Sequence, residues 1–204
     1  MAAQGPPGRR AAPFAGAKPP PPYSDAERAE LAAVAAAQRS PVKRASALAM
    51  VVFGIGAGLR PGELVALRGS DLARRGHQVM VEAGGPAARL VPADSRYAGR
   101  AAELARRSGR GWVFRPGPAD RGYKNFVTNF ARTLVADPAA PRLSMSRARS
   151  SFICDHLAAG TPLAELLAIT GIRQAESLAR YARHVEAAPA KAVLRAWDKN
   201  QQAR

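Results

Sequence analysis

Apolar residues recur with a helical period in the first third of the chain. A helix is predicted over residues 25–38, because Ser24 precedes Glu27 by three residues, the capping-box spacing that satisfies free amides at a helix start. A second helix is predicted to begin at Pro41, since proline at the first helical position loses no hydrogen bond. It continues through the apolar stretch 47–53 and ends at the glycines that follow.

The period changes in the middle of the chain. Val79 and Val81 alternate with polar or smaller residues, and a turn at 84–86 separates them from the segment Arg89-Leu90-Val91. This alternation predicts a β-hairpin. The apolar residues 112–114 predict a short third strand.

Helical spacing dominates the remaining segments. Further helices are expected at 61–67, with a capped turn at 70–71, and at 101–107, 126–134, 144–159, 163–169, 176–184 and from Pro189 onward. The expected fold is therefore mainly α with a small antiparallel β-hairpin or three-stranded sheet, an α+β arrangement.

The first 22 residues differ in composition from the rest. They contain the cluster Gly5-Pro6-Pro7-Gly8 and the run Pro19 to Pro22, with three basic residues and no acidic one. We interpret residues 1–22 as a disordered basic tail with a stiff polyproline end. Residues 23–204 are assigned to one domain, because a chain of this length supports one well-packed core.

The charge of the chain favours a polyanionic partner. Lys and Arg number 31 against 15 Asp and Glu, which gives a formal net charge of +16 and a pI near 11.4. DNA, RNA and anionic lipid all carry matching charge. Most of the cations are arginine, whose guanidinium grips a phosphate through two parallel hydrogen bonds. RNA is the weaker alternative, because aromatic residues make up only 6% and no stacking motif is present.

Several other classes of function are not supported. No apolar stretch approaches the roughly 20 residues that a membrane span requires, and no secretory signal is recognisable, so we expect a cytoplasmic protein without membrane contact. Cys154 is the only cysteine, and its apolar neighbours suggest a small buried residue. Three scattered histidines without carboxylate or cysteine partners predict no metal site, and no cofactor motif is present.

Three passages carry a resemblance to a known family. They are residues 56–71 (GAGLRPGELVALRGSD), residues 146–160 (SRARSSFICDHLAAG), and residues 163–171 followed by 177–181. The first is similar to the first arginine box of tyrosine recombinases, the phage-integrase family. The second is similar to the family's His-x-x-Arg box, and the third resembles the segment that leads to the nucleophilic tyrosine. The resemblance covers residues 24–184.

The resemblance implies a site and a reaction. In the family a tyrosine oxygen attacks a DNA phosphodiester to give a 3′-phosphotyrosine link, and a 5′-hydroxyl later attacks that link without a metal. Two arginines stabilise the extra charge of the transition state. The matching positions are Arg60, Arg149 and Tyr181. From the residues alone, Arg60 could instead only pair with Glu63, and Tyr181 could be a partly buried structural residue.

All three positions that assist proton transfer in the family depart from its pattern. Gly84 stands where the hairpin lysine belongs, while Ser146 and Ile172 stand where two histidines, or a histidine and a tryptophan, belong. Such groups are typically worth about 10²–10⁴-fold in rate, so slow cleavage is expected. Arg89 and Lys124 are nearby substitutes to consider. The helical core-binding domain that completes the family's clamp on DNA is also not recognisable.

Two hypotheses follow for function. The first is an integrase-like protein that binds double-stranded DNA and recombines it, with impaired catalysis; the second is a non-catalytic DNA-binding accessory or regulatory protein of a mobile element. The residues expected to contact DNA, besides those of the site, are Arg68, Arg89, Lys124, Arg147 and Arg173. The resemblance also implies a homo-oligomer on DNA or a partner recombinase.

Overall fold

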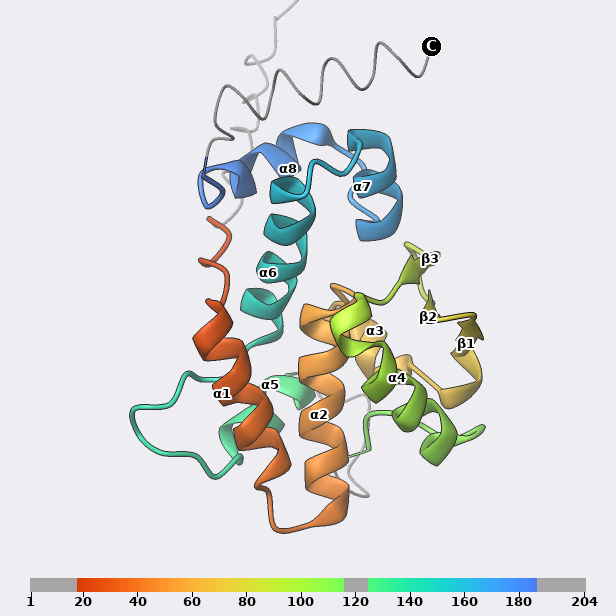
Figure 1. Ribbon diagram of the computed structural model, residues 1–204, viewed down its shortest axis with the longest axis vertical. Coiled ribbons are helices and arrows are strands. Elements are labelled where there is room, and N and C mark those ends of the chain that lie inside the picture. The colour runs from red at the N-terminus through yellow and green to blue at the C-terminus, as the bar shows by residue number, and fades with distance from the viewer. Residues whose placement is uncertain (1–17, 116–124, 187–204) are drawn as a thin grey trace, which may run out of the picture.

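The computed structural model describes residues 18–115 and 125–186, which are mostly helical with one three-stranded antiparallel sheet (Figure 1). The helices are α1 (Asp25–Ala36), α2 (Pro41–Ile55), α3 (Pro61–Ala66), the 3₁₀ turn η1 (Gly69–Asp71), α4 (Ser95–Ser108), α5 (Phe126–Arg132), α6 (Met145–Ala158), α7 (Leu163–Thr170) and α8 (Ala175–Ala182). The strands are β1 (Leu72–Arg75), β2 (Gln78–Ala83) and β3 (Arg89–Pro92). The mainly α architecture with a small sheet is confirmed.

The two N-terminal helices begin where the capping residues predict. The Ser24 side chain accepts from the Glu27 amide while the Glu27 carboxylate accepts from the Ser24 amide, so the capping box at the start of α1 is confirmed. Ser40 caps α2 with Pro41 in its first turn. The helices α1 and α2 pack side by side, and the apolar residues of α2 from Ala47 to Ile55 are mostly buried.

The predicted hairpin is confirmed, but the predicted third strand is wrong. β2 pairs antiparallel with β3, with Val81 opposite Val91, and the third strand is β1, which pairs with the other edge of β2. Residues 112–114 form only an isolated bridge between Trp112 and Arg68. Their apolar character serves the core instead, because Phe114 meets the rings of Phe126 and Phe130 edge to face.

Helix α4 is longer than its apolar residues indicate. The helix was predicted over 101–107, whereas it begins at Ser95, because Asp94 accepts from the Arg96 amide and caps it. The other predicted helix bounds within the described residues agree within about two residues, and α5, for example, ends at Arg132. The helix expected from Pro189 lies outside the described residues, as do residues 1–17 of the expected tail.

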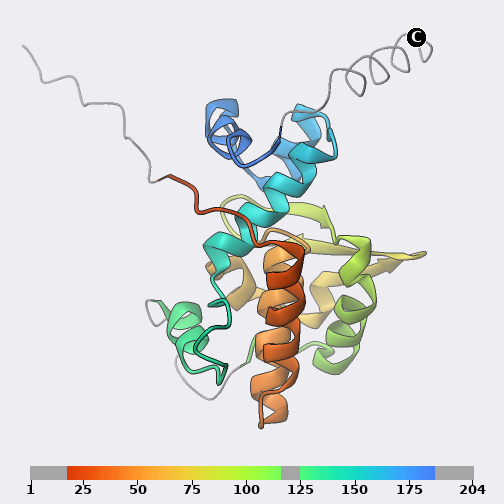
Figure 2. The ribbon, with the colours of Figure 1, turned by 60° about the vertical axis from the view of Figure 1, so that its left-hand side comes forward.

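Helix α6 connects the body of the fold to its C-terminal helices. It packs against α2 at one end and against α7 and α8 at the other, as Figure 2 shows from a second side. Its residues Phe152 and Ile153 are buried in the same core as Phe53 and Leu59. Because α6 bridges both parts, a side chain on it can lie between the α2–α3 turn and the α7–α8 pair.

The turn before α3 depends on a glycine. Gly58 has φ +59°, and a Cβ atom there would lie 2.4 Å from Cδ1 of the buried Phe152 ring. We expect Gly58→Ala to lower the free energy of unfolding by about 2–5 kcal/mol, from left-handed backbone strain and overpacking. Urea denaturation measures this loss. The matched control is Gly62→Ala in α3, where a Cβ meets nothing within 4 Å, and a gain of about 0.5–1 kcal/mol is expected. Equal stabilities of the two variants would contradict the prediction.

Candidate functional site

Arg60 stands at the N-terminus of α3, directly after the Gly58 turn. Its amide donates to Oε2 of Glu63 at 2.8 Å, which fixes the backbone of Arg60 at the helix start. Its guanidinium donates to the carbonyl of Gly171 at 3.1 Å, and the side chain is 43% exposed. Arg60 is therefore held at the surface with much of its hydrogen-bonding capacity still facing solvent.

Arg149 reaches the same region from α6. It donates to the carbonyl of Gly58 and, at 2.7 Å, to the carbonyl of Thr170. Burial, together with the nearby charges of Arg60 and Arg89, lowers the pKa of Arg149 to about 10. The guanidinium remains protonated at neutral pH in a site whose positive charge is only partly compensated. Such an environment favours binding of an anion.

Tyr181 approaches from α8 and completes a shared pocket. Tyr181 is partly buried against the core. A pocket of about 240 Å³ is lined by Pro19, Arg60, Arg149, Ile172, Ser177, Arg180 and Tyr181. The structure thus brings together the two arginines and the tyrosine that the motifs selected, from three segments far apart in the chain.

Three consecutive carbonyls at the end of α7 accept hydrogen bonds from three arginines. The carbonyl of Ile169 accepts from Arg89 at 2.7 Å, that of Thr170 from Arg149, and that of Gly171 from Arg60. The C-terminal end of a helix carries partial negative charge, which stabilises nearby cations. The end of α7 therefore gathers the guanidinium groups and offsets part of their mutual repulsion.

Arg89 is buried next to this site. Its side chain is 6% exposed and binds the carboxylate of Glu63 through two hydrogen bonds of 2.6 and 3.0 Å. Burial alone would raise the pKa of Glu63, but the hydrogen bonds from Arg89 and the Arg60 amide hold it below its ordinary value. The donors of Arg89 therefore bind protein acceptors in this structure, and its direct contact with DNA stays a prediction.

Of the three positions that depart from the family pattern, one lies in the pocket. Ile172 lines it directly. Gly84 is exposed in the turn between β2 and β3, where a Cβ would meet nothing within 4 Å. Ser146 is exposed near the start of α6, three residues before Arg149, and its hydroxyl lies 2.9 Å from that of Ser144. No titratable side chain stands at any of these three positions.

The other residues expected to contact DNA are spread over the molecule. Arg173 is exposed and lines a shallow hollow with residues of the β2–β3 turn, beside the pocket. Arg68 is exposed with its guanidinium 3.8 Å over the Trp112 ring, and it is not among the residues that line the pocket. Arg147 donates to Pro21, Pro22 and Glu27. Lys124 lies outside the described residues.

Sequence reasoning did not select three of the pocket residues. Ser177 precedes Tyr181 by four residues, so helical periodicity places it on the same face and could have signalled it. Arg180 is adjacent to Tyr181 in sequence, and the family motifs do not select it. Pro19 carried no signal, because a proline-rich segment does not reveal which surface it crosses.

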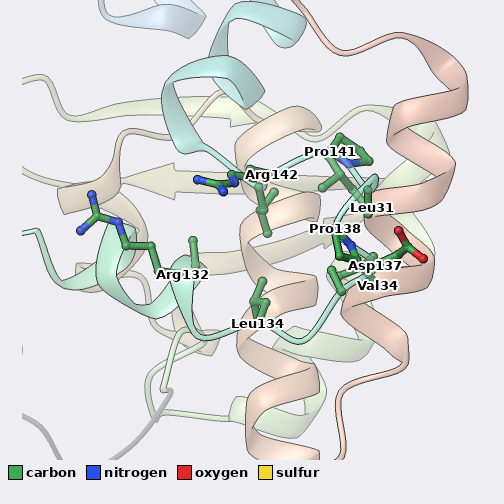
Figure 3. A pocket seen from close by; sticks show the side chains of 12 residues that line it. Leu31, Val34, Arg132, Leu134, Asp137, Pro138, Pro141 and Arg142 are labelled. Atoms are coloured by element: carbon green, nitrogen blue, oxygen red, sulfur yellow. The ribbon is translucent and has the colours of Figure 1, made fainter.

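A second hollow lies on another part of the fold. It has a volume of about 430 Å³ and is lined by α1 and the segment that follows α5 (Figure 3). In Figure 3 the Arg132 side chain extends away from Leu31, Val34 and Pro138. The lining is mainly apolar near α1, and it shares no residue with the Arg60–Tyr181 pocket.

Residues 18–115 and 125–186 contain no group of three His, Cys, Asp or Glu side chains arranged to hold a metal ion. No helix within these residues has the length and apolar character for a bilayer crossing. Cys154 is buried, and burial raises the pKa of its thiol to about 11.

Comparison with solved structures identifies the fold. XerA recombinase superposes with a TM-score of 0.58 at 18% identity, over 93% of this chain and 66% of that one. XerH site-specific recombinase, in a pre-cleavage complex with its difH substrate, gives a TM-score of 0.61 at 13% identity, over 81% of this chain and 51% of that one. The Tn1549 transposon integrase, in complex with circular intermediate DNA, gives 0.58 at 15% identity, over 87% of this chain and 66% of that one.

These likenesses establish the fold of a tyrosine recombinase catalytic domain. The chain spans between about half and two thirds of the length of those proteins. No family model and no curated protein matches the sequence.

Proposed function

We propose that this protein binds double-stranded DNA and recombines or integrates it by phosphotyrosine strand exchange, with impaired catalysis. One observation carries the proposal: Arg60, Arg149 and Tyr181 line a single pocket. Two guanidinium groups beside a phenol suit a phosphodiester, which is an anion whose charge increases during displacement. The fold of the XerH and Tn1549 complexes, whose partner is DNA, supports the same ligand.

In the proposed reaction the pocket residues supply the nucleophile and the charge stabilisation, and water supplies the proton transfers. The Tyr181 oxygen loses its proton to water and forms a bond to phosphorus, while the bond from phosphorus to the 5′-oxygen breaks and that oxygen takes up a proton from water. A 5′-hydroxyl then attacks the phosphotyrosine and releases Tyr181. Arg60 and Arg149 bind the phosphate oxygens and stabilise the additional negative charge of the transition state.

The impairment of catalysis follows from the residues at three positions. Glycine, serine and isoleucine at positions 84, 146 and 172 supply no group that donates a proton to the departing oxygen near neutral pH. The 5′-oxygen then leaves without a positioned acid. We therefore expect cleavage that is slow but still dependent on Tyr181.

A suicide DNA substrate tests the proposal. A nicked duplex that loses its 5′-hydroxyl fragment on cleavage should accumulate a covalent protein–DNA adduct, visible by denaturing electrophoresis, with the full chain but not with Tyr181→Phe. DNA affinity of Tyr181→Phe should stay within about twofold, whereas Arg60→Ala should weaken binding by about tenfold or more, the loss of a charge-assisted contact. An adduct that persists in Tyr181→Phe would refute the assigned nucleophile.

The second candidate is a non-catalytic DNA-binding accessory or regulatory protein of a mobile element. The replacement of all three proton-transfer positions favours it. It predicts no adduct with any variant, while Arg60→Ala and Arg149→Ala still weaken DNA binding. Both proposals include a cytoplasmic location. Both also include either an oligomer of this protein on DNA or a partner recombinase.

A further inference from the structure

The proline run before α1 crosses the rim of the pocket. Residues 18–23, which we call the strap, run from the start of α1 along α6 toward α8 (Figure 2). Pro19 lines the Arg60–Tyr181 pocket. Tyr23 anchors the other end of the strap: it is buried, its amide donates to Oγ of Ser151 at 2.8 Å, and its hydroxyl donates to the carbonyl of Arg142 at 2.6 Å.

The strap is held by side chains that contact its carbonyls. Arg147 donates to the carbonyls of Pro21 and Pro22 at 3.1 and 3.3 Å. At the end of the strap that lines the pocket, the Arg183 guanidinium donates to the carbonyl of Pro19 at 3.3 Å, and Nε2 of His184 lies 3.2 Å from the same oxygen. We call Arg147, Arg183 and His184 the rim. Proline lacks an N–H, so the four prolines of the strap offer acceptors without competing donors.

Phosphate oxygens are stronger partners for these donors than neutral carbonyls. A phosphate carries a full negative charge, and it can accept two parallel hydrogen bonds from one guanidinium. The carbonyls of the strap thus occupy donors that flank the proposed phosphate pocket on α6 and just after α8. The acidic partner of Arg147 is Glu27, which binds it at 2.7 Å and is itself part of the α1 capping box.

We propose that the rim is a second binding surface for the phosphates of the DNA backbone and that the strap covers it in the free protein. This inference rests on the proposed function, because it assigns to the rim the phosphates next to the one in the pocket. DNA binding then exchanges the carbonyls of Pro19, Pro21 and Pro22 for phosphate oxygens. The strap lowers DNA affinity by the free energy of its own docking.

A looser strap should therefore strengthen DNA binding. We expect the full chain with Pro19→Gly, Pro20→Gly, Pro21→Gly and Pro22→Gly to bind a short duplex about tenfold more tightly at fixed salt, measured by anisotropy of a labelled duplex. Glycine keeps every strap carbonyl but raises the entropy of the undocked chain. Pro20→Gly alone leaves in place the three prolines whose carbonyls contact the rim. It should raise DNA affinity by about two- to fivefold, and it replaces the quadruple variant in the test if that variant unfolds at the assay temperature.

A matched control and a second substitution sharpen the test. Pro138→Gly, in the segment after α5, should leave affinity unchanged. We call the quadruple proline-to-glycine variant the loosened chain. Arg147→Ala should weaken DNA binding more in the loosened chain than in the natural one. In the natural chain the same substitution also releases the strap, which offsets part of the lost affinity. In the loosened chain it should also reduce the salt dependence by about one phosphate contact.

The outcomes separate this inference from the proposed function. Tighter binding by the loosened chain supports the covered rim. Unchanged or weaker binding by the loosened chain, with Arg60→Ala still weakening the natural protein, overturns the covered rim and leaves the proposed function standing. If Arg60→Ala and Arg149→Ala change DNA affinity in neither background, the proposed function fails and the rim fails with it.

Discussion

A Gly84→Lys variant is expected to form the covalent DNA adduct about 10²–10⁴ times faster than the natural chain, the usual worth of positioned proton transfer. The β2–β3 turn that holds Gly84 lies beside the pocket, since Ala87 of that turn lines a hollow together with Ile172, which also lines the pocket. A Cβ at position 84 meets nothing within 4 Å, so a side chain can start there without a clash. Its ammonium would protonate the departing 5′-oxygen.

Two controls isolate the proton transfer from the added charge. Gly99→Lys on α4 adds the same charge at a position with equally open surroundings, and it should leave the adduct rate unchanged. Tyr181→Phe introduced together with Gly84→Lys should abolish the adduct. An adduct rate that stays the same in Gly84→Lys, with DNA affinity retained, would show that the missing lysine does not limit cleavage.

Glu63→Ala is expected to lower the free energy of unfolding by about 3–5 kcal/mol, because it leaves the buried Arg89 guanidinium without its carboxylate partner. The same change removes the acceptor for the Arg60 amide, so DNA affinity should fall as well. Urea denaturation gives the stability and duplex titration the affinity. Glu103→Ala is the matched control, because its pair with Arg106 is exposed and should contribute no more than about 0.5 kcal/mol.

The same carboxylate predicts a dependence on pH. Because the pKa of Glu63 in the folded protein lies below its ordinary value, its stabilising contribution is complete above that ordinary pKa. The contribution is lost as the pH falls through the lowered pKa. In Glu63→Ala this part of the acid loss should disappear, and an unchanged pH profile of stability would contradict the assigned pairing.

Local signals in the sequence predicted most of the helices and the hairpin. The caps at Ser24 and Ser40 are short-range hydrogen bonds that three or four residues encode, and the structure contains both. Strand β1 was not predicted, because only Leu72 of its four residues is buried and the strand shows no alternation of apolar and polar residues. The strand expected at 112–114 was wrong because an apolar run fits a buried core segment as well as a strand.

The site was less accessible to sequence reasoning than the fold. Arg60, Arg149 and Tyr181 were selected by family motifs, since no periodic pattern links residues so distant in the chain. The pairing of Arg89 with Glu63, 26 residues away, could not be predicted, because no local pattern links the two residues. The strap shows the same difficulty, because the contacts of Pro21 and Pro22 lie more than 120 residues away in sequence.

The three acceptors at the end of α7 bear on how this site can diverge. They belong to the main chain, so substitution at Ile169 or Thr170 changes a side chain but leaves the carbonyl in place. Only Gly171, with φ +63°, is restricted by its backbone. During evolution, almost every residue of this helix can therefore be substituted while the helix still stabilises the charges of the arginines. Recognition of distant members from their sequences then depends on the arginines themselves.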